Sequence, residues 1–103
     1  MKKTIYISIP ITGHNEKKQR EKADRIKAHL SKNGYEVVNP FDIYAGDHPD
    51  YFDHICHDLR ALSDCDEAYF CLGWQNSKGC QLERQFCDIY GKVLRFESSE
   101  IWR

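Results

Sequence analysis

The sequence lacks any long apolar run. Its 103 residues contain no stretch of about 18 consecutive apolar residues, the length that a membrane-spanning helix requires. Met1 to Thr4 lead directly into a short strand-like run and then Pro10, which is not the pattern of a secretory signal peptide. We therefore expect a cytoplasmic protein without a membrane span.

An excess of either charge is also missing. The chain has 15 lysines and arginines against 16 aspartates and glutamates, for a net charge of −1. Surfaces that bind nucleic acids or anionic membranes carry a basic excess. We therefore expect neither a nucleic-acid polymer nor a membrane as partner.

The chain has five cysteines, an odd number, and no CxxC pair. This pattern is typical of free thiols in a reducing compartment and not of a disulfide framework. His54, Cys56 and His57 are the one cluster that suggests a metal, but on a helix Cys56 points away from the face that the two histidines share. No second ligand pair follows at zinc spacing. The sequence predicts neither a metal site nor a cofactor.

Turn and cap residues divide the chain into alternating strands and helices. The predicted strands are 4–9, 35–38, 67–72 and 92–96, and the predicted helices are 15–33, one that opens at Pro49 and Asp50, and 77–91. Alternation with short connections indicates a parallel sheet covered on both faces. We predict one α/β domain over residues 1–103, a flavodoxin-like three-layer sandwich with strand order 2-1-3-4.

Each predicted helix has apolar residues at helical spacing. They are Ala23, Ile26 and Leu30 in the first, Phe52, Ile55, Leu59 and Leu62 in the second, and Leu82, Phe86 and Ile89 on one face of the third. The regular spacing in the second helix predicts a stripe that faces inward.

The stretch from residue 73 to 83 carries the strongest functional signal. In a sheet of this order, ligands bind beyond the carboxyl ends of the strands, between the first and third strands. Ser77 is a good helix N-cap, and Gly79 leaves room for a ligand at the first turn. Glu83 has no charged residue at helical spacing, which favours a nucleophile or an acid–base group. The alternative is an ordinary surface glutamate.

The same edge of the sheet gathers further candidates. Loops at residues 8–13, 39–40 and 72–77 meet there. Tyr6, near the end of the first strand, either reaches the crevice or is a core tyrosine. Asp58 lies at the border of the second helix's apolar stripe and is either functional or a cap or salt-bridge partner.

Four segments resemble the nucleoside 2-deoxyribosyltransferase-like superfamily, and more closely its small branch known as a domain of unknown function (DUF4406). The segments are Lys3–Ser8 with Pro10–Gly13, Gly34–Pro40, Asp58-Leu59 with Cys65-Asp66, and Gly73-Trp74 through Ser77–Gly79 to Leu82-Glu83. They cover nearly the whole chain. The resemblance implies the flavodoxin-like fold predicted above.

The resemblance also implies a reaction, the cleavage or transfer of the N-glycosidic bond of a (deoxy)nucleoside or nucleoside 5′-monophosphate. Glu83 matches the nucleophile that attacks C1′, Tyr6 the tyrosine beside it, and Asp58 the group that assists proton transfer to the leaving base. Such a pair of carboxyl groups suits an oxocarbenium-like transition state. Substrate contacts are implied for Ser8, Ile9, Pro10, Thr12, Gly13, Asn39, Pro40, Trp74, Ser77 and Gly79.

Three positions depart from the characterised members. Ser77 replaces an aspartate of many transferases, but it matches the serine that lies at the phosphate in hydrolases of deoxynucleoside 5′-monophosphates. A serine at a helix N-terminus suits an anion. Ile9 replaces a glycine of that branch, and Thr12 brings no charge. The alternative functions are therefore a catalytically inactive nucleotide-binding or sensing module, and an interaction domain with a vestigial crevice.

The short chain ends in an apolar pair, Ile101-Trp102, which is unfavourable in water. Symmetric association is the usual way to cover such residues. We therefore expect a homodimer or a higher homo-oligomer, which light scattering measures.

Overall fold

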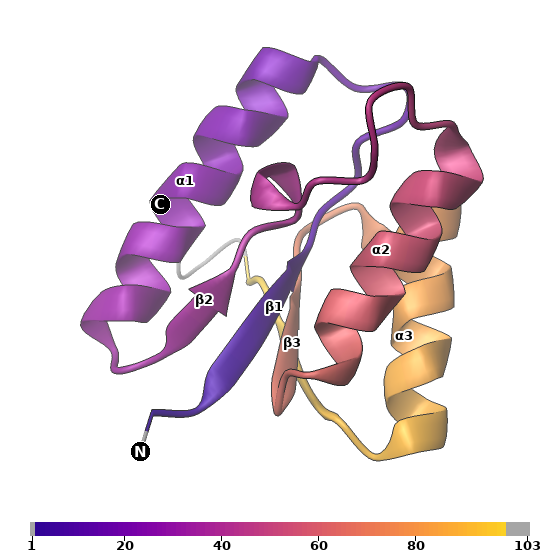
Figure 1. Cartoon of the computed structure of the whole chain (residues 1–103). Coiled ribbons are helices and arrows are strands. Elements are labelled where there is room, and N and C mark those ends of the chain that lie inside the picture. The colour runs from indigo at the N-terminus through magenta and orange to yellow at the C-terminus, as the bar shows by residue number, and fades with distance from the viewer. Residues whose placement is uncertain (1, 99–103) are drawn as a thin grey trace.

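The computed structural model describes residues 2–98 and has a four-stranded parallel sheet at its centre (Figure 1). The strands are β1 (Thr4–Ser8), β2 (Glu36–Val38), β3 (Glu67–Phe70) and β4 (Val93–Phe96). Their order is β2-β1-β3-β4, and every neighbouring pair is parallel. The predicted α/β class and strand order are therefore confirmed.

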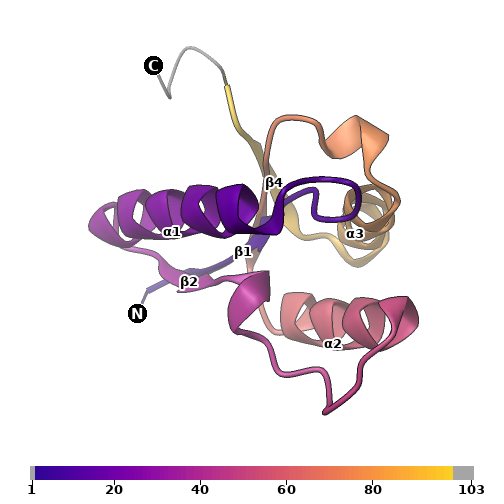
Figure 2. The ribbon, with the colours of Figure 1, turned by 90° about the horizontal axis from the view of Figure 1, so that it is seen from above.

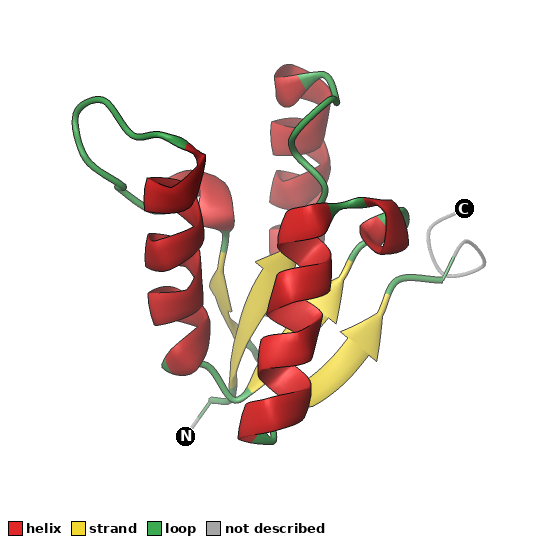
Figure 3. Ribbon diagram, turned by 90° about the vertical axis from the view of Figure 1, so that its right-hand side faces the viewer, coloured by secondary structure: helices red, strands yellow, loops and turns green. Residues whose placement is uncertain are grey.

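Helices cover both faces of this sheet. Helix α1 (Glu16–Lys32) lies on one face, and α2 (Tyr51–Ser63) and α3 (Lys78–Tyr90) lie side by side on the other (Figure 2). Two single turns of 3-10 helix, η1 (Pro40–Asp42) and η2 (Trp74–Asn76), follow β2 and β3. The strand arrows in Figure 3 point to one end of the molecule, where these turns and the first turns of the helices gather.

The helices begin at the residues that the cap signals predict. The Asn15 side chain accepts a hydrogen bond from the Lys18 amide at 3.0 Å. Asp50 and Asp53 form a reciprocal capping box at the start of α2, at 2.8 and 2.9 Å. The Ser77 side chain accepts from the Cys80 amide at the start of α3. These caps pair amides that have no acceptor within the helix, and so set the residue at which each helix begins. Each of these starts lies at the carboxyl edge of the sheet.

The core has two halves, one on each face of the sheet. The half under α1 is made of Ile5, Ile7, Ile9, Ala23, Ile26, Leu30, Tyr69 and Cys71. The half under α2 and α3 is made of Tyr6, Leu62, Cys65, Ala68, Phe70 and Cys87. Because alternate strand residues point to opposite faces, β1 and β3 contribute to both halves and are apolar almost throughout.

Helix α3 does not bury the face that is richest in large apolar residues. Its buried residues are Cys80, Glu83 and Cys87, whereas Leu82 is 43% exposed and Ile89 is 67% exposed. The two small thiols let the helix pack closely on the sheet, and hydrogen bonds compensate the burial of the Glu83 carboxyl group. Of the apolar face that the spacing indicates, only Phe86 packs against the core, and Leu82 and Ile89 lie outside it.

The predicted inward stripe of α2 is correct for Leu62, which is fully buried, but wrong for Phe52, which is 72% exposed. A helix of 13 residues is about 20 Å long, whereas the four residues of β3 span about 13 Å. The first turn of α2 therefore extends past the carboxyl edge of the sheet, where the strands offer Phe52 nothing to pack against.

Two further expectations concern a membrane span and the oligomeric state. No helix among residues 2–98 is long and apolar enough to cross a bilayer. Ile101 and Trp102 lie outside the described residues, so the expected homo-oligomer stays a prediction.

The burial of Leu62 and the exposure of Phe52 predict unequal effects of alanine substitutions at these two positions in α2. Leu62→Ala should lower the free energy of unfolding by about 2–5 kcal/mol, because it leaves a cavity in the core. Phe52→Ala should change it by about 0.5 kcal/mol or less, because the ring is mostly in water. Urea denaturation of both variants measures the difference, and equal losses would contradict the assigned burial.

Candidate active site

A buried carboxyl group, that of Glu83, lies at the carboxyl edge of the sheet. Its side chain comes from the second turn of α3 and is only 4% exposed. The Tyr6 hydroxyl donates a hydrogen bond to Oε2 at 2.6 Å, and the Ser8 hydroxyl donates to Oε1 at 2.7 Å. Both donors are on β1, two residues apart and therefore on the same face of the sheet. One strand thus fixes both carboxyl oxygens.

Glu83 opens into a cavity of about 490 Å³ beyond the ends of β1 and β3. The predicted site residues that line the cavity are Tyr6, Ile9, Thr12, Pro40, Asp58, Ser77, Gly79 and Glu83. They come from β1, the loops after β1 and β2, the third turn of α2, and the N-cap and first two turns of α3. Segments far apart in sequence therefore converge on one cavity large enough for a nucleoside-sized molecule.

Five predicted contact residues do not line this cavity. They are Ser8, Pro10, Gly13, Asn39 and Trp74. Ser8 lies behind Glu83 and holds it. The Asn39 side chain accepts from the Phe41 amide at 3.0 Å and so begins η1. Trp74 packs edge-on against Phe70 of β3. These three residues position the cavity wall and are not part of its surface.

Sequence reasoning missed several lining residues. They are Ile11, Glu16, Arg20, Phe41, Ile43, Tyr51, His54, Ile55, Asn76, Lys78 and Cys80. The guanidinium carbon of Arg20 lies 4.7 Å from the centre of the Phe41 ring, so α1 and η1 meet at the cavity. For His54 a signal existed in the sequence, because it precedes Asp58 by four residues and must share its helix face.

The pKa of Glu83 is raised from 4.5 to about 7. Burial is the main cause, and the nearby Asp58 charge acts in the same direction. The hydrogen bonds from Tyr6 and Ser8 oppose this rise, because they favour the ionised carboxylate. Near neutral pH both the protonated and the ionised form are therefore accessible, which suits a group that changes its charge during a reaction.

Asp58, from α2, lies half-buried in the same cavity. Burial raises its pKa from 3.8 to about 6, while the nearby His54 and His57 lower it. A carboxyl group with such a pKa can hold a proton near neutrality and give it up. The cavity thus contains two carboxyl groups whose pKa values are both raised, on neighbouring helices.

The start of α3 is the part of the cavity whose chemistry suits an anion. The first backbone amides of a helix have no acceptor within the helix, and here the Lys78 and Gly79 amides are at this position. The Lys78 side chain also lines the cavity. A Cβ on Gly79 would lie 3.4 Å from Ile55 Cδ1, so glycine lets α2 approach the helix start. These features together suit a phosphate or another anion.

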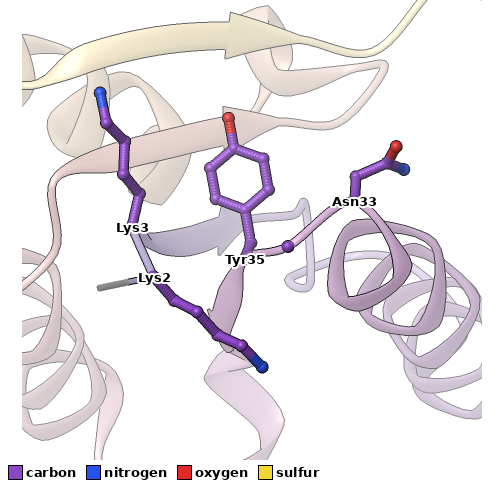
Figure 4. A pocket seen from close by; sticks show the side chains of 5 residues that line it. Lys2, Lys3, Asn33 and Tyr35 are labelled. Carbon is purple, nitrogen blue, oxygen red and sulfur yellow. The ribbon is translucent and has the colours of Figure 1, made fainter.

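A second hollow, of about 600 Å³, lies at the opposite, amino end of the strands (Figure 4). It is lined by Lys2, Lys3, Asn33, Gly34 and Tyr35. The Tyr35 hydroxyl donates to the buried Glu67 at 2.9 Å, and Arg95 donates to the same carboxylate at 3.0 Å. These contacts hold the strand starts together. Among residues 2–98, no three His, Cys, Asp or Glu side chains are grouped so that they could bind a metal ion.

Residues 3–96 match a protein family described as Domain of unknown function (DUF4406). The chain belongs to this family. No curated protein matches the sequence significantly. A solved 2-deoxyribosyltransferase from the psychrotolerant bacterium Bacillus psychrosaccharolyticus is similar in structure, with a TM-score of 0.71 at 16% sequence identity. The similarity covers 90% of this chain and 70% of that one. This DUF4406 chain therefore has the fold of the nucleoside 2-deoxyribosyltransferase-like superfamily, as its sequence motifs predict.

The raised pKa of Glu83 predicts a dependence of stability on pH. Because the folded-state pKa of about 7 exceeds the ordinary 4.5, the folded protein binds this proton more tightly than the unfolded chain. The free energy of unfolding should therefore fall as pH rises through this window. Glu83→Gln removes this contribution, so the free energy of unfolding of the variant should not show this fall. Relative to the wild type, it should rise by up to about 3 kcal/mol from about pH 5 to about pH 8.

Urea denaturation at both pH values measures this gain. Glu21→Gln is the matched control, because Glu21 is exposed on α1. A constant difference between Glu83→Gln and the wild type across this pH range would contradict the assigned burial.

Proposed function

We propose that this protein cleaves or transfers the N-glycosidic bond of a nucleoside or nucleoside 5′-monophosphate, with Glu83 as nucleophile. The observation that carries the proposal is the buried Glu83 carboxyl group, which two β1 hydroxyls hold at 2.6 and 2.7 Å at the base of the cavity. A carboxyl group is costly to bury, and among residues 2–98 no cationic side chain forms an ion pair with this one, although it faces a cavity. Nucleophilic catalysis accounts for both features.

The two carboxyl groups divide the reaction between them. Ionised Glu83 attacks C1′ of the sugar, and the bond between C1′ and the base nitrogen breaks. Protonated Asp58 gives its proton to the departing base, so that the electron pair of the broken bond leaves on a neutral base. Asp58, now ionised, then takes a proton from an incoming water or base as that molecule attacks C1′. The bond between C1′ and Glu83 breaks, and Glu83 leaves as the carboxylate.

Tyr6 and Ser8 are positioning residues in this scheme. Their hydrogen bonds stop rotation of the carboxyl group and favour its ionised form against the effect of burial. Burial and the Glu83 charge raise the pKa of Tyr6 well above its ordinary value. The phenol therefore stays protonated and remains a donor near neutral pH.

The cavity also favours a phosphorylated substrate. Ser77 and Lys78 form the start of α3, and Arg20 supplies a second cationic side chain from α1. A 5′-phosphate placed between them would leave C1′ free to approach Glu83. The 2-deoxyribosyltransferase of the same fold is described as a biocatalyst for nucleoside synthesis, which supports a nucleoside substrate class for this chain.

A nucleotide-binding module without turnover is the second candidate. Ile9 favours it, because its buried side chain lines the cavity where the resemblance implies a glycine that lets the ligand approach the backbone. The same cavity, anion-binding helix start and aromatic lining would then serve binding alone.

Two substitutions test the catalytic proposal. Glu83→Gln is nearly isosteric but supplies no anionic nucleophile, so base release should fall about a thousandfold or more. In Asp58→Asn, the rate of base release should fall less for a nucleotide with an N7-methylated purine than for an ordinary nucleotide, because the methylated base leaves without protonation. Chromatography of released base measures both rates, and mass spectrometry detects a sugar adduct on Glu83.

Wild-type turnover in Glu83→Gln would remove the nucleophile assignment. A wild type that binds deoxynucleotides, as shown by a thermal shift, but releases no base from any of them would favour the binding module. Circular dichroism of both variants shows whether they are folded.

The pH profile of base release tests the division of roles. Activity requires ionised Glu83, with a pKa of about 7, and protonated Asp58, with a pKa of about 6. The profile should therefore be bell-shaped, with its maximum between these values. In Asp58→Asn the falling limb should disappear. The remaining rising limb then reports the ionisation of Glu83 alone. Stopped assays across the pH range measure the limbs, and an unchanged bell in Asp58→Asn would assign the acid to another group.

A further inference from the structure

His54 lies where α2 faces the cavity. It precedes Asp58 by one helical turn, so the two side chains lie on the same face with their Cβ atoms about 5–6 Å apart. Both line the cavity, whereas the neighbouring His57 does not. His54 lies nearer the start of α2 than Asp58, and it is exposed whereas Asp58 is half-buried.

The roles proposed above determine where the leaving base must lie. Glu83 attacks C1′ from the β1 side, so the base leaves on the opposite side of the sugar. Asp58 must come within hydrogen-bond reach of the base to protonate it. The base therefore lies against the cavity-facing side of α2, the side that carries His54.

The surroundings of this position suit a flat aromatic ring. Pro40, Phe41 and Ile43, from η1 and the residue after it, form one wall, and Tyr51 on the first turn of α2 lies beside His54. Aromatic and apolar side chains stack on nucleobases without regard to sequence. Polar groups at the edge of the nucleobase must then orient it. The His54 ring can both donate and accept a hydrogen bond.

We infer that His54 is a base-recognition residue, which contacts the edge of the nucleobase beside Asp58 and sets how the base is held. This inference rests on the proposed function. Asp58 and His54 then divide the work on the base, because Asp58 transfers a proton in the transition state and His54 binds the ring. Loss of His54 should therefore raise KM, whereas loss of Asp58 should lower kcat.

A matched control exists on the same helix. Both His54 and His57 lower the pKa of Asp58 through their charge. If His54 acted only through that electrostatic effect, His57→Gln and His54→Gln would change the kinetics alike. A contact with the base is lost only in His54→Gln. Both histidines are exposed, so neither substitution should disturb the fold.

The first measurement is the kinetics of base release by wild type, His54→Gln and His57→Gln on the same deoxynucleoside 5′-monophosphate. We expect His54→Gln to raise KM about tenfold, as for one lost hydrogen bond, with kcat changed little. His57→Gln should leave KM unchanged, because it loses only the electrostatic effect on Asp58. If the two variants match each other while the wild type releases base, the inference is overturned and the proposed function stands.

The second measurement does not depend on turnover. Proton–carbon NMR resolves the ring signals of the five histidines, and the two variants assign those of His54 and His57. We expect adenine, hypoxanthine, cytosine or uracil to move the His54 signal and leave that of His57 in place. The abasic compound 2-deoxyribose 5-phosphate should leave the His54 signal in place.

The two measurements separate the possible failures. A base that moves the His54 signal without any base release in the kinetic assay supports base recognition and removes the catalytic function. If none of the four bases moves the His54 signal, or if the abasic sugar phosphate moves it equally, the inference is overturned. The wild-type spectra decide this once the folded variants have assigned the two signals.

Discussion

The contact between Glu83 and the two hydroxyls of β1 is the interaction on which the site depends. A carboxyl group buried without partners would be destabilising by several kcal/mol. Here Tyr6 and Ser8 each donate to one of its oxygens, at 2.6 and 2.7 Å. The two donors are rigid, because β1 is a central strand that pairs with β2 and β3 on either side. The carboxyl group is therefore presented to the cavity in one orientation.

This contact also determines how α3 lies on the sheet. With Glu83 turned inward, Cys80 and Cys87 become the other inward residues, since they lie one turn before and after it. Their small size lets the helix lie close enough for the carboxyl group to reach β1. The larger Leu82 and Ile89 are consequently left on the outside. The helix thus exposes apolar surface so that a polar group can lie in the site.

The positions of α2 and α3 give the cavity two ends that differ in chemistry. Its first turn extends beyond the sheet and carries Tyr51 and His54 over the cavity, while Asp58 on the next turn lies deeper. Gly79 lets Ile55 approach the start of α3, so the two helix starts flank one space. The α3 end offers backbone amides and Lys78 to an anion, and the α2 end offers histidine and carboxyl groups beside apolar walls. This polarity is the basis of the proposed phosphorylated substrate.

The sequence by itself determined the fold and most of the residues at the bottom of the site. Caps at Asn15, Asp50 and Ser77 and glycines after the helices are local signals, and parallel topology restricts what alternating elements can form. The converging ends of β1 and β3 then placed Tyr6 and Glu83 at one edge. Only the tertiary structure decided that Ser8 holds Glu83 instead of lining the cavity, and that α3 buries its less apolar face. It also brought Arg20 and Phe41 to the cavity. These outcomes depend on the balance between close packing and hydrogen bonding across elements distant in sequence, which no local pattern encodes.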